Sequence, residues 1–321
     1  MTNGKLLFAL LAAAVPAAAQ LPEFYRRVDR IFWVVDNLEG SAAGWRNAGI
    51  CETAATGAHT RDGARWSVAR LGDAIVDFIQ PSSGSSVFAD YRKSRGQGPF
   101  ALLHRAPTET SLDQEVGRMR ALGVGVLASG RVEDSHARYV LFDTARDGKY
   151  VLGVIFAPPG EYTGSLAPPP VQPAPKRVSQ YAFVVRDLLA VSKYWVGLGF
   201  PEMSFTHPYL WDLRYHGGAG DFDANLGWQK HGRVQYEWIQ PTKGPTTYMD
   251  HMAKYGEGFH HIAFATGDID REQREWSKAG FPTTQSGAWG ERDQAGYGRY
   301  AYQDTHAIGG VEVELLWNFR K

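Results

Sequence analysis

The chain has 321 residues, of which 44% are hydrophobic and 21% charged, a length and composition that fit two folded domains of ordinary size. Lysine plus arginine number 34 and aspartate plus glutamate also number 34, so no basic excess exists to neutralise phosphates and we expect no binding to nucleic acid. The one cysteine, Cys51, excludes an intramolecular disulfide and a cysteine-based zinc cluster.

The first residues differ in character from the rest of the chain. Lys5 precedes an apolar run from Leu6 to Val15, and small residues follow at 17–19. This order is typical of a cleaved secretory signal peptide, and the apolar run is too short to cross ~30 Å of hydrocarbon as an anchor. We therefore expect residues 1–19 to be removed and the protein to be periplasmic or secreted, with no membrane attachment after cleavage.

The remaining chain repeats itself at intervals of 150 to 161 residues. Val28–Val35 recurs as Val178–Val185, and Phe78–Pro81 recurs as Trp238–Pro241. Such matches in chain order predict a duplicated domain. Seven prolines between residues 158 and 175 favour an extended linker. The expected domains are residues 21–157 and 176–321, joined by residues 158–175.

Each domain is expected to consist of two similar halves. Three pairs of residues in the second domain recur at an offset of 81: Gln180 and His261, Asp187 and Asp268, Gly199 and Gly280. In each half an apolar strand precedes an Asp suited to a helix N-cap, an amphipathic helix, and a Gly suited to the helix end. Short alternating runs then predict further strands. The expected elements are helices at 188–198 and 271–279 and strands at 181–185, 262–265, 299–303 and 311–317.

This strand-helix-strand-strand-strand pattern, with Gly-Glu-Gly-Phe-His-His-Ile-Ala-Phe at residues 256–264, resembles the vicinal-oxygen-chelate superfamily of glyoxalase I, methylmalonyl-CoA epimerase and the extradiol dioxygenases. At the level of the module pattern, the resemblance extends over nearly the whole mature chain. Specific similarity of motifs is limited to residues 248–281 and 309–317. It implies an α+β fold of tandem domains, each formed by two βαβββ modules that curl a mixed sheet around a cleft. It also implies metal ligands on the first and last strands of each module.

Carried over to this sequence, the implied ligands are Gln180, Glu237, His261 and Glu314. Three oxygen donors and one imidazole suit Zn²⁺, Ni²⁺, Co²⁺ or Mn²⁺. Fe²⁺ fits less well, because Gln180 stands where iron dioxygenases carry a histidine. His260 precedes His261, and since side chains alternate along a strand we expect only His261 to face the cleft and His260 to cap or face solvent.

The equivalent positions of the first domain hold Arg30, Asp77, Ala101 and Gly153. Ala101 and Gly153 offer no ligating side chain, and the permanent charge of Arg30 repels a cation. We therefore expect a metal-free first domain that packs against the second or shapes its cleft.

The implied activity is that of a divalent-metal-dependent lyase or isomerase acting on a small oxygenated substrate. The metal polarises the substrate oxygens, and Glu314 or Glu237 removes the acidified proton to give a metal-stabilised enediolate, without consumption of oxygen. Tyr300, Trp289 and His306 are expected near the mouth of the cleft. Export argues against substrates linked to coenzyme A or glutathione.

Two alternatives stay open. A degenerate first domain followed by a complete second one also resembles the extradiol and hydroxyphenylpyruvate dioxygenases, which are non-haem iron enzymes. A non-catalytic protein that binds a small molecule is the other alternative. A homodimer also stays open.

Overall fold

The computed structural model describes most of the chain after the expected signal peptide. Residues 1–19 and nearly all of the expected linker, 158–175, lie outside the described residues. Within the described part, no helix is long and apolar enough to cross a membrane. The described ranges are 20–49, 51–53, 59–61, 64–82, 84–131, 136–158 and 177–319.

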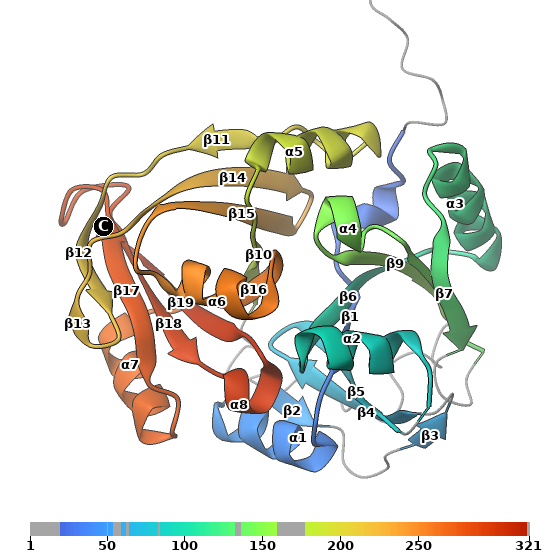
Figure 1. Ribbon diagram of the computed structural model, residues 1–321, viewed down its shortest axis with the longest axis horizontal. Coiled ribbons are helices and arrows are strands. Elements are labelled where there is room, and N and C mark those ends of the chain that lie inside the picture. The colour runs from blue at the N-terminus through green and yellow to red at the C-terminus, as the bar shows by residue number, and fades with distance from the viewer. Residues whose placement is uncertain are drawn as a thin grey trace, which may run out of the picture.

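The first sheet is built from residues 30–156 (Figure 1). Its strands follow the order β2-β4-β5-β1-β6-β9-β8-β7, with β3 paired beside β4. The 3-10 helix η2 (Glu23–Arg26) precedes it. The elements are β1 (Arg30–Val34), α1 (Leu38–Asn47), β2 (Cys51–Thr53), β3 (His59–Arg61), β4 (Ala64–Leu71), β5 (Ala74–Pro81), α2 (Val87–Arg95), β6 (Gly98–Arg105), α3 (Glu109–Ala121), β7 (Val126–Arg131), β8 (Arg138–Phe142), α4 (Ala145–Gly148) and β9 (Val151–Phe156).

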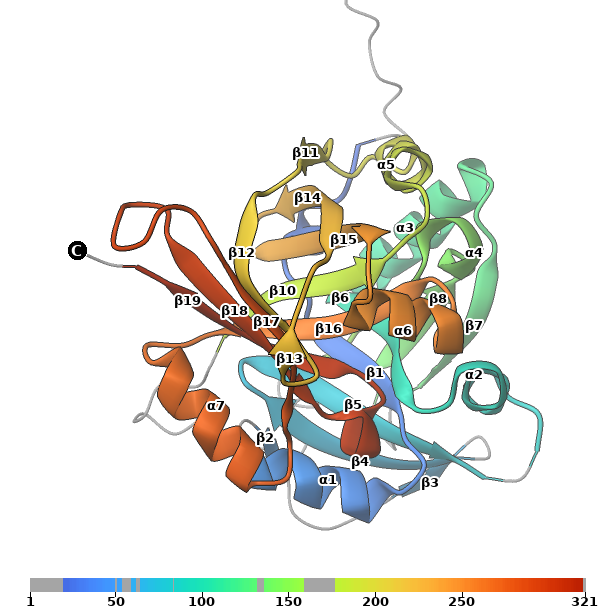
Figure 2. The same ribbon diagram turned by 60° about the vertical axis from the view of Figure 1, so that its left-hand side comes forward.

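The second sheet is built from residues 178–318 and contains the order β11-β14-β15-β10-β16-β19-β18-β17-β12-β13. Its curl is visible in Figure 2. The elements are β10 (Val178–Val184), α5 (Leu188–Gly197), β11 (Ser204–Thr206), β12 (Leu210–Tyr215), β13 (Gly218–Ala219), β14 (Asp223–His231), β15 (Val234–Lys243), α6 (Thr247–Tyr255), β16 (Gly258–Ala265), α7 (Ile269–Lys278), β17 (Thr283–Trp289), β18 (Gly298–Asp304), α8 (His306–Gly309) and β19 (Glu312–Asn318).

Both sheets are assembled in the same way from two modules. The first strands of the two modules run antiparallel to each other, β1 beside β6 and β10 beside β16. The last strand of each module lies parallel to its first strand, as β15 does to β10 and β19 to β16. This confirms the predicted α+β class and the tandem, curled mixed sheets. The pair β12–β13 was not predicted; β12 leaves the first module and extends the sheet beside β17 of the second.

The local signals for the helices of the second domain are confirmed. The Asp187 carboxylate accepts a hydrogen bond from the Ala190 amide at the start of α5, and Asp268 caps α7 in the same way. Gly199 and Gly280 follow these helices at φ +90° and +93°, a backbone conformation that favours glycine. Helix α7 begins two residues earlier than expected, because Ile269 directly follows the capping Asp268.

The two domains pack against each other through a quasi-symmetric pair of contacts. Helix α8 lies on α1, and α4 lies on α5 (Figure 1). The Trp33 indole donates to the Gly309 carbonyl at 2.8 Å, and the Trp195 indole donates to the Gly148 carbonyl at 3.1 Å. A side chain at either glycine would collide with a tryptophan, Trp45 or Trp195. Tryptophans of both domains therefore lie at the interface, and one hydrophobic core runs through both domains.

Candidate metal centre

The strand register brings the four predicted ligands onto one face of the second sheet. Ala182 on β10 lies opposite both Glu237 and His261, and Ala263 on β16 lies opposite both Glu314 and Gln180. Because side chains alternate along a strand, residues paired in this way share a face. The four residues are contributed by neighbouring strands: Gln180 by β10, Glu237 by β15, His261 by β16 and Glu314 by β19.

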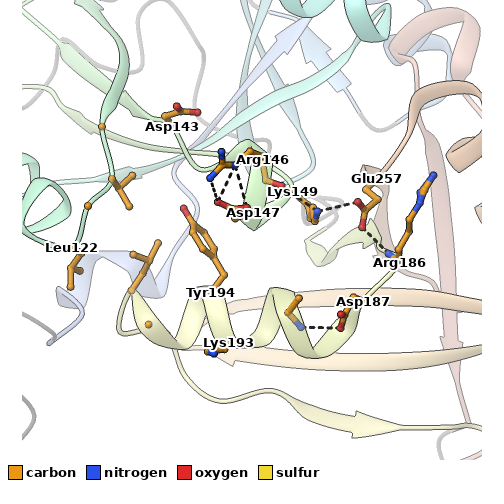
Figure 3. A pocket seen from close by; sticks show the side chains of 16 residues that line it. Leu122, Asp143, Arg146, Asp147, Lys149, Arg186, Asp187, Lys193, Tyr194 and Glu257 are labelled. Carbon is orange, nitrogen blue, oxygen red and sulfur yellow. Dashed lines mark hydrogen bonds and ion pairs between the residues drawn. The ribbon is translucent and has the colours of Figure 1, made fainter.

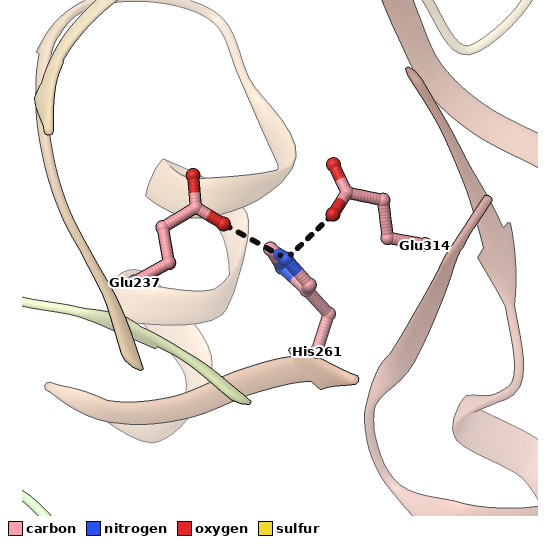
Figure 4. A group of neighbouring side chains, drawn as sticks. All are labelled: Glu237, His261 and Glu314. Atoms are coloured by element: carbon pink, nitrogen blue, oxygen red, sulfur yellow. Dashed lines mark ion pairs between the residues drawn. The ribbon is translucent and has the colours of Figure 1, made fainter. Parts of the chain in front are cut away.

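Three of these side chains converge closely (Figure 4). The His261 Nε2 atom lies 3.4 Å from Glu237 Oε2 and 3.2 Å from Glu314 Oε2, and the three ligand atoms all lie within 4.8 Å of one another. Two donors bound at about 2.1 Å to one ion lie about 3.0 Å apart at a right angle and about 3.4 Å apart at a tetrahedral angle. The spacing therefore fits the coordination sphere of one metal ion.

The donor atoms are also buried without hydrogen-bond partners. Within the described residues these atoms are Gln180 Oε1, Glu237 Oε2, His261 Nε2 and Glu314 Oε2. The contacts from His261 to the two carboxylates have the distances of ion pairs but not the geometry of hydrogen bonds. Buried polar atoms are ordinarily satisfied, so four such atoms on one face need a partner. The residues present fit a divalent cation.

The electrostatics of the cluster point the same way. Burial alone would lower the pKa of His261, but the carboxylates of Glu314 and Glu237 outweigh it and raise this pKa to about 9. Burial raises the pKa of Glu314, against the attraction of His261. Without a cation, the site therefore holds a protonated imidazole between two carboxylates, and a divalent cation would take the place of that proton.

The expectation for His260 was wrong. Phe183 pairs with Phe259 while the next residue, Ala182, pairs with His261, so His260 is an extra residue in a β-bulge. His260 is 1% exposed, and its Nδ1 atom lies 2.9 Å from Nδ1 of His261. Simple alternation does not hold across a bulge, and this bulge brings both imidazoles to the same buried cluster.

A cleft of about 420 Å³ opens at the donors. Tyr300 and Trp289 line it, as expected, with Gln180, Glu237 and Glu314. His306 does not lie there: it begins α8, where its Nδ1 is 2.9 Å from Asp304, and its carbonyl accepts from Gln97 of the first domain. The residues that line the cleft lie between 179 and 318, so the described part of the first domain packs against the second domain but does not line this cleft.

Two further tyrosines of the site were missed by sequence reasoning. The Tyr302 hydroxyl lies 2.7 Å from the Tyr248 hydroxyl, and Tyr302 pairs with Glu314 across β18 and β19. Burial raises the pKa of both tyrosines, so both stay protonated. Tyr302 could have been found from strand alternation, because it lies two residues after Tyr300. Tyr248 begins a helix whose placement only the tertiary structure shows.

The first domain repeats the register with different chemistry. Phe32 lies opposite Asp77 and Ala101, as Ala182 lies opposite Glu237 and His261. The Arg30 guanidinium donates to Asp77 at 3.0 Å, and both side chains are about 1% exposed. In the first domain, the guanidinium of Arg30 therefore lies beside the Asp77 carboxylate, where a metal ion would otherwise have to bind. Aromatic rings packed edge to face fill the space above it: Phe32, Trp66, Phe88 and Tyr139.

A larger groove, of about 900 Å³, lies between the domains (Figure 3). Two ion pairs lie in it: Lys149 is 3.0 Å from Glu257, and Arg146 is 3.1 Å from Asp147. It contains none of the converging donor atoms, so size alone does not make it the better candidate.

Comparison with known proteins supports the assignment of the fold. Residues 179–302 match the family described as Glyoxalase/Bleomycin resistance protein/Dioxygenase superfamily, and a comparison with curated proteins gave no match. A variant of 4-hydroxymandelate synthase from Streptomyces coelicolor superposes with a TM-score of 0.63 at 15% identity, over 92% of this chain and 94% of that one. A xylose isomerase-like TIM barrel/4-hydroxyphenylpyruvate dioxygenase fusion protein gives a TM-score of 0.54 at 15% identity, over 91% of this chain and 49% of its own.

At such low identity these structures establish the fold alone, and the fold they share with this chain extends through both domains. Together with the sequence match of the second domain, this confirms the resemblance seen in the sequence. Residues 179–302 thus match the Glyoxalase/Bleomycin resistance protein/Dioxygenase superfamily, and the chain as a whole has the tandem two-domain fold of these structures.

Proposed function

We propose that the second domain holds one divalent metal ion and that the protein is a non-haem iron dioxygenase for a small aromatic substrate with two adjacent oxygen donors. The observation that carries this proposal is the convergence of His261, Glu237 and Glu314 beside an aromatic cleft. The tandem fold shared with 4-hydroxymandelate synthase and the hydroxyphenylpyruvate dioxygenase fusion supports the choice of reaction class.

The three side chains come from strands of one sheet and so approach an ion from one side. His261, Glu237 and Glu314 would hold the ion, and three protein ligands on one side are the arrangement that non-haem iron oxygenases use. When bound, Fe²⁺ would supply the redox chemistry that lets dioxygen react with an organic substrate. The set of one imidazole and two carboxylates differs from the usual set of two histidines and one carboxylate. The difference arises because Gln180 stands where iron dioxygenases carry a histidine.

The lining of the cleft favours a flat substrate that carries no charge beyond the oxygens that would bind the metal. No lysine or arginine is found among the described residues that line it, so the phosphates of coenzyme A or the carboxylates of glutathione would meet no counter-charge. Trp289 and Tyr300 stack with ring centroids 6.5 Å apart and form one wall. A volume of about 420 Å³ is that of a site for a small molecule. Aromatic walls suit an aromatic ring.

The chain also supplies a group that can take up a proton. Glu314 lines the cleft and lies opposite Tyr302, whose hydroxyl contacts that of Tyr248. This position lets Glu314 accept a proton from a substrate hydroxyl. Glu237 lines the opposite side of the donor set and is the other candidate base.

A second candidate function, a lyase or isomerase working by proton transfer, is favoured by one observation. The Gln180 Oε1 atom is buried at the cleft without a hydrogen-bond partner. If this oxygen is a fourth ligand, the four side chains would hold an ion that polarises a chelating substrate, and Glu314 or Glu237 would remove the α-proton of that substrate. Zn²⁺, Ni²⁺, Co²⁺ or Mn²⁺ would serve that chemistry.

The deciding experiment loads the purified full chain with Fe²⁺ without oxygen and then measures oxygen uptake with catechols and aryl 2-oxo acids. Uptake matched by incorporation of labelled dioxygen into the product, and lost in His261→Ala, supports the dioxygenase. Exchange of an α-proton for deuterium without oxygen uptake supports the isomerase. Tight ligand binding without either reaction supports a non-catalytic binder. Gln180→Ala separates the ligand sets, because it keeps the metal only if three ligands suffice.

A further inference from the structure

The bulge in β16 has a counterpart in β6 of the first domain, but the residue on it differs. In the first domain Trp33 pairs with Pro99 and Phe32 pairs with Ala101, which leaves Phe100 as the extra residue. Phe100 packs on Phe88 of α2, with ring centroids 5.4 Å apart. The bulge is therefore a property of the backbone and does not need an imidazole.

In the second domain the bulge residue is His260, and its environment matches that of Phe100. Its ring lies 5.1 Å from Tyr248 of α6, the counterpart of Phe88. A phenyl ring at this position would pack equally well, as Phe100 does in the first domain. The imidazole appears in the domain that carries the donor set, and it contacts one of the donors, His261.

The contact between the two histidines leaves one consistent arrangement of protons. Two Nδ1 atoms 2.9 Å apart share one proton, so one donates and the other accepts. The Nε2 atom of His261 faces Glu237 and Glu314 and must be free of hydrogen to bind a metal. The hydrogen of His261 is then on Nδ1, which makes it the donor and His260 the acceptor.

The far side of His260 is anchored as well. On this side its ring lies 5.1 Å from that of Tyr248, at the start of α6. The start of α6 is itself fixed to β17, because the Thr247 amide and the Thr246 hydroxyl both donate to Gln285 Oε1, at 3.0 and 2.8 Å. The helix start that packs against His260 is therefore held in place.

We propose that His260 is a positioning residue of the metal centre: it accepts the Nδ1 hydrogen of His261 and so holds that ring in the tautomer and orientation that turn Nε2 towards the metal. Partners of this kind fix the tautomer of a ligating histidine and strengthen its binding. The inference rests on the metal site of the proposed function but on neither of its reactions.

The test compares His260→Asn with His260→Leu in the full chain. The two side chains have nearly the same shape, but only asparagine has an oxygen close to the position of Nδ1. We expect His260→Leu to weaken Zn²⁺ binding by about 10- to 100-fold, measured by competition with a chelator, and His260→Asn to restore it to within about threefold. The visible spectrum of the Co²⁺ form should change with leucine and recover with asparagine. Thermal unfolding of the metal-free variants controls for packing.

A direct readout of the tautomer separates this inference from the proposed function. Imidazole nitrogen shifts in protein labelled at histidine should show a bare Nδ1 in His260 and a protonated Nδ1 in His261, with or without metal. The opposite assignment, or equal metal affinity in the leucine and asparagine variants, overturns the inference while leaving the proposed function intact. A wild-type chain that binds no divalent cation overturns both. Metal binding with the expected difference between variants, but no oxygen uptake, supports the inference and overturns only the dioxygenase.

Discussion

Metal binding at the second domain should strengthen as the pH rises, because the ion must displace a proton from His261. In the metal-free protein the two carboxylates, Glu314 and Glu237, raise the pKa of His261 to about 9 although burial opposes them. At pH 7, two units below that value, about 1% of the protein has a free Nε2. The apparent affinity at pH 7 is therefore about 100-fold weaker than the intrinsic one, a cost of about 3 kcal/mol.

The dissociation constant for Zn²⁺ should thus fall about tenfold for each pH unit up to about pH 9 and then level off. Competition against a chelator of known pH dependence measures this slope, and calorimetry in two buffers of different ionisation enthalpy counts the proton released. His261→Asn is the control, because it has no imidazole to titrate and its weak binding should lose this dependence. A wild-type dissociation constant that is the same at pH 6.5 and 8.5 would refute the reasoning.

The same shift has a consequence for the stability of the metal-free protein. A histidine whose pKa is higher in the folded than in the unfolded chain stabilises the fold below its unfolded value, here 6.5. This contribution is lost as the pH rises through about 9. Urea unfolding of the metal-free chain should therefore show a decreasing free energy of unfolding from about pH 6.5 to 9, whereas saturating Zn²⁺ should remove the decrease.

Other experiments test the number of metal ions, the role of Glu314, the Arg30–Asp77 ion pair and the signal peptide separately. Elemental analysis of the pure, untagged protein should find one metal per chain, because Arg30 pairs with Asp77 where the first domain would need ligands; two equivalents would contradict this. Glu314→Gln should reduce turnover by at least about 100-fold while the circular dichroism spectrum stays unchanged, and a folded variant with full turnover would remove Glu314 from the chemistry. Arg30→Met should lower the free energy of unfolding by about 3–5 kcal/mol, because it leaves the charge of Asp77 buried, and Arg30→Met combined with Asp77→Leu should recover much of that loss in urea titrations. Amino-terminal sequencing of the protein from a cell fraction outside the cytoplasm should begin after residue 19 if residues 1–19 are a signal peptide; an intact start in the cytoplasm would exclude export.

Much of the fold could be read from local signals. The repeat of Val28–Val35 as Val178–Val185 predicted two copies, and the capping residues Asp187 and Asp268 located α5 and α7 to within two residues. These signals are local because a cap or an alternating strand depends on residues only a few positions apart. The donor residues could also be predicted from the sequence, because the offset of 81 residues pairs Gln180 with His261 by module symmetry.

The sequence by itself therefore determined the tandem modules and the four donor candidates. Only the tertiary structure decided that His260 shares the buried cluster with His261, since a bulge is set by how β16 pairs with β10 and leaves no mark on the sequence of one strand. Likewise, β12 joins β17 from the other module because the sheet curls far enough to bring these strands together. The ion pair of Arg30 and Asp77 joins residues 47 apart. Contacts between distant strands depend on register and curvature, which are properties of the assembled sheet.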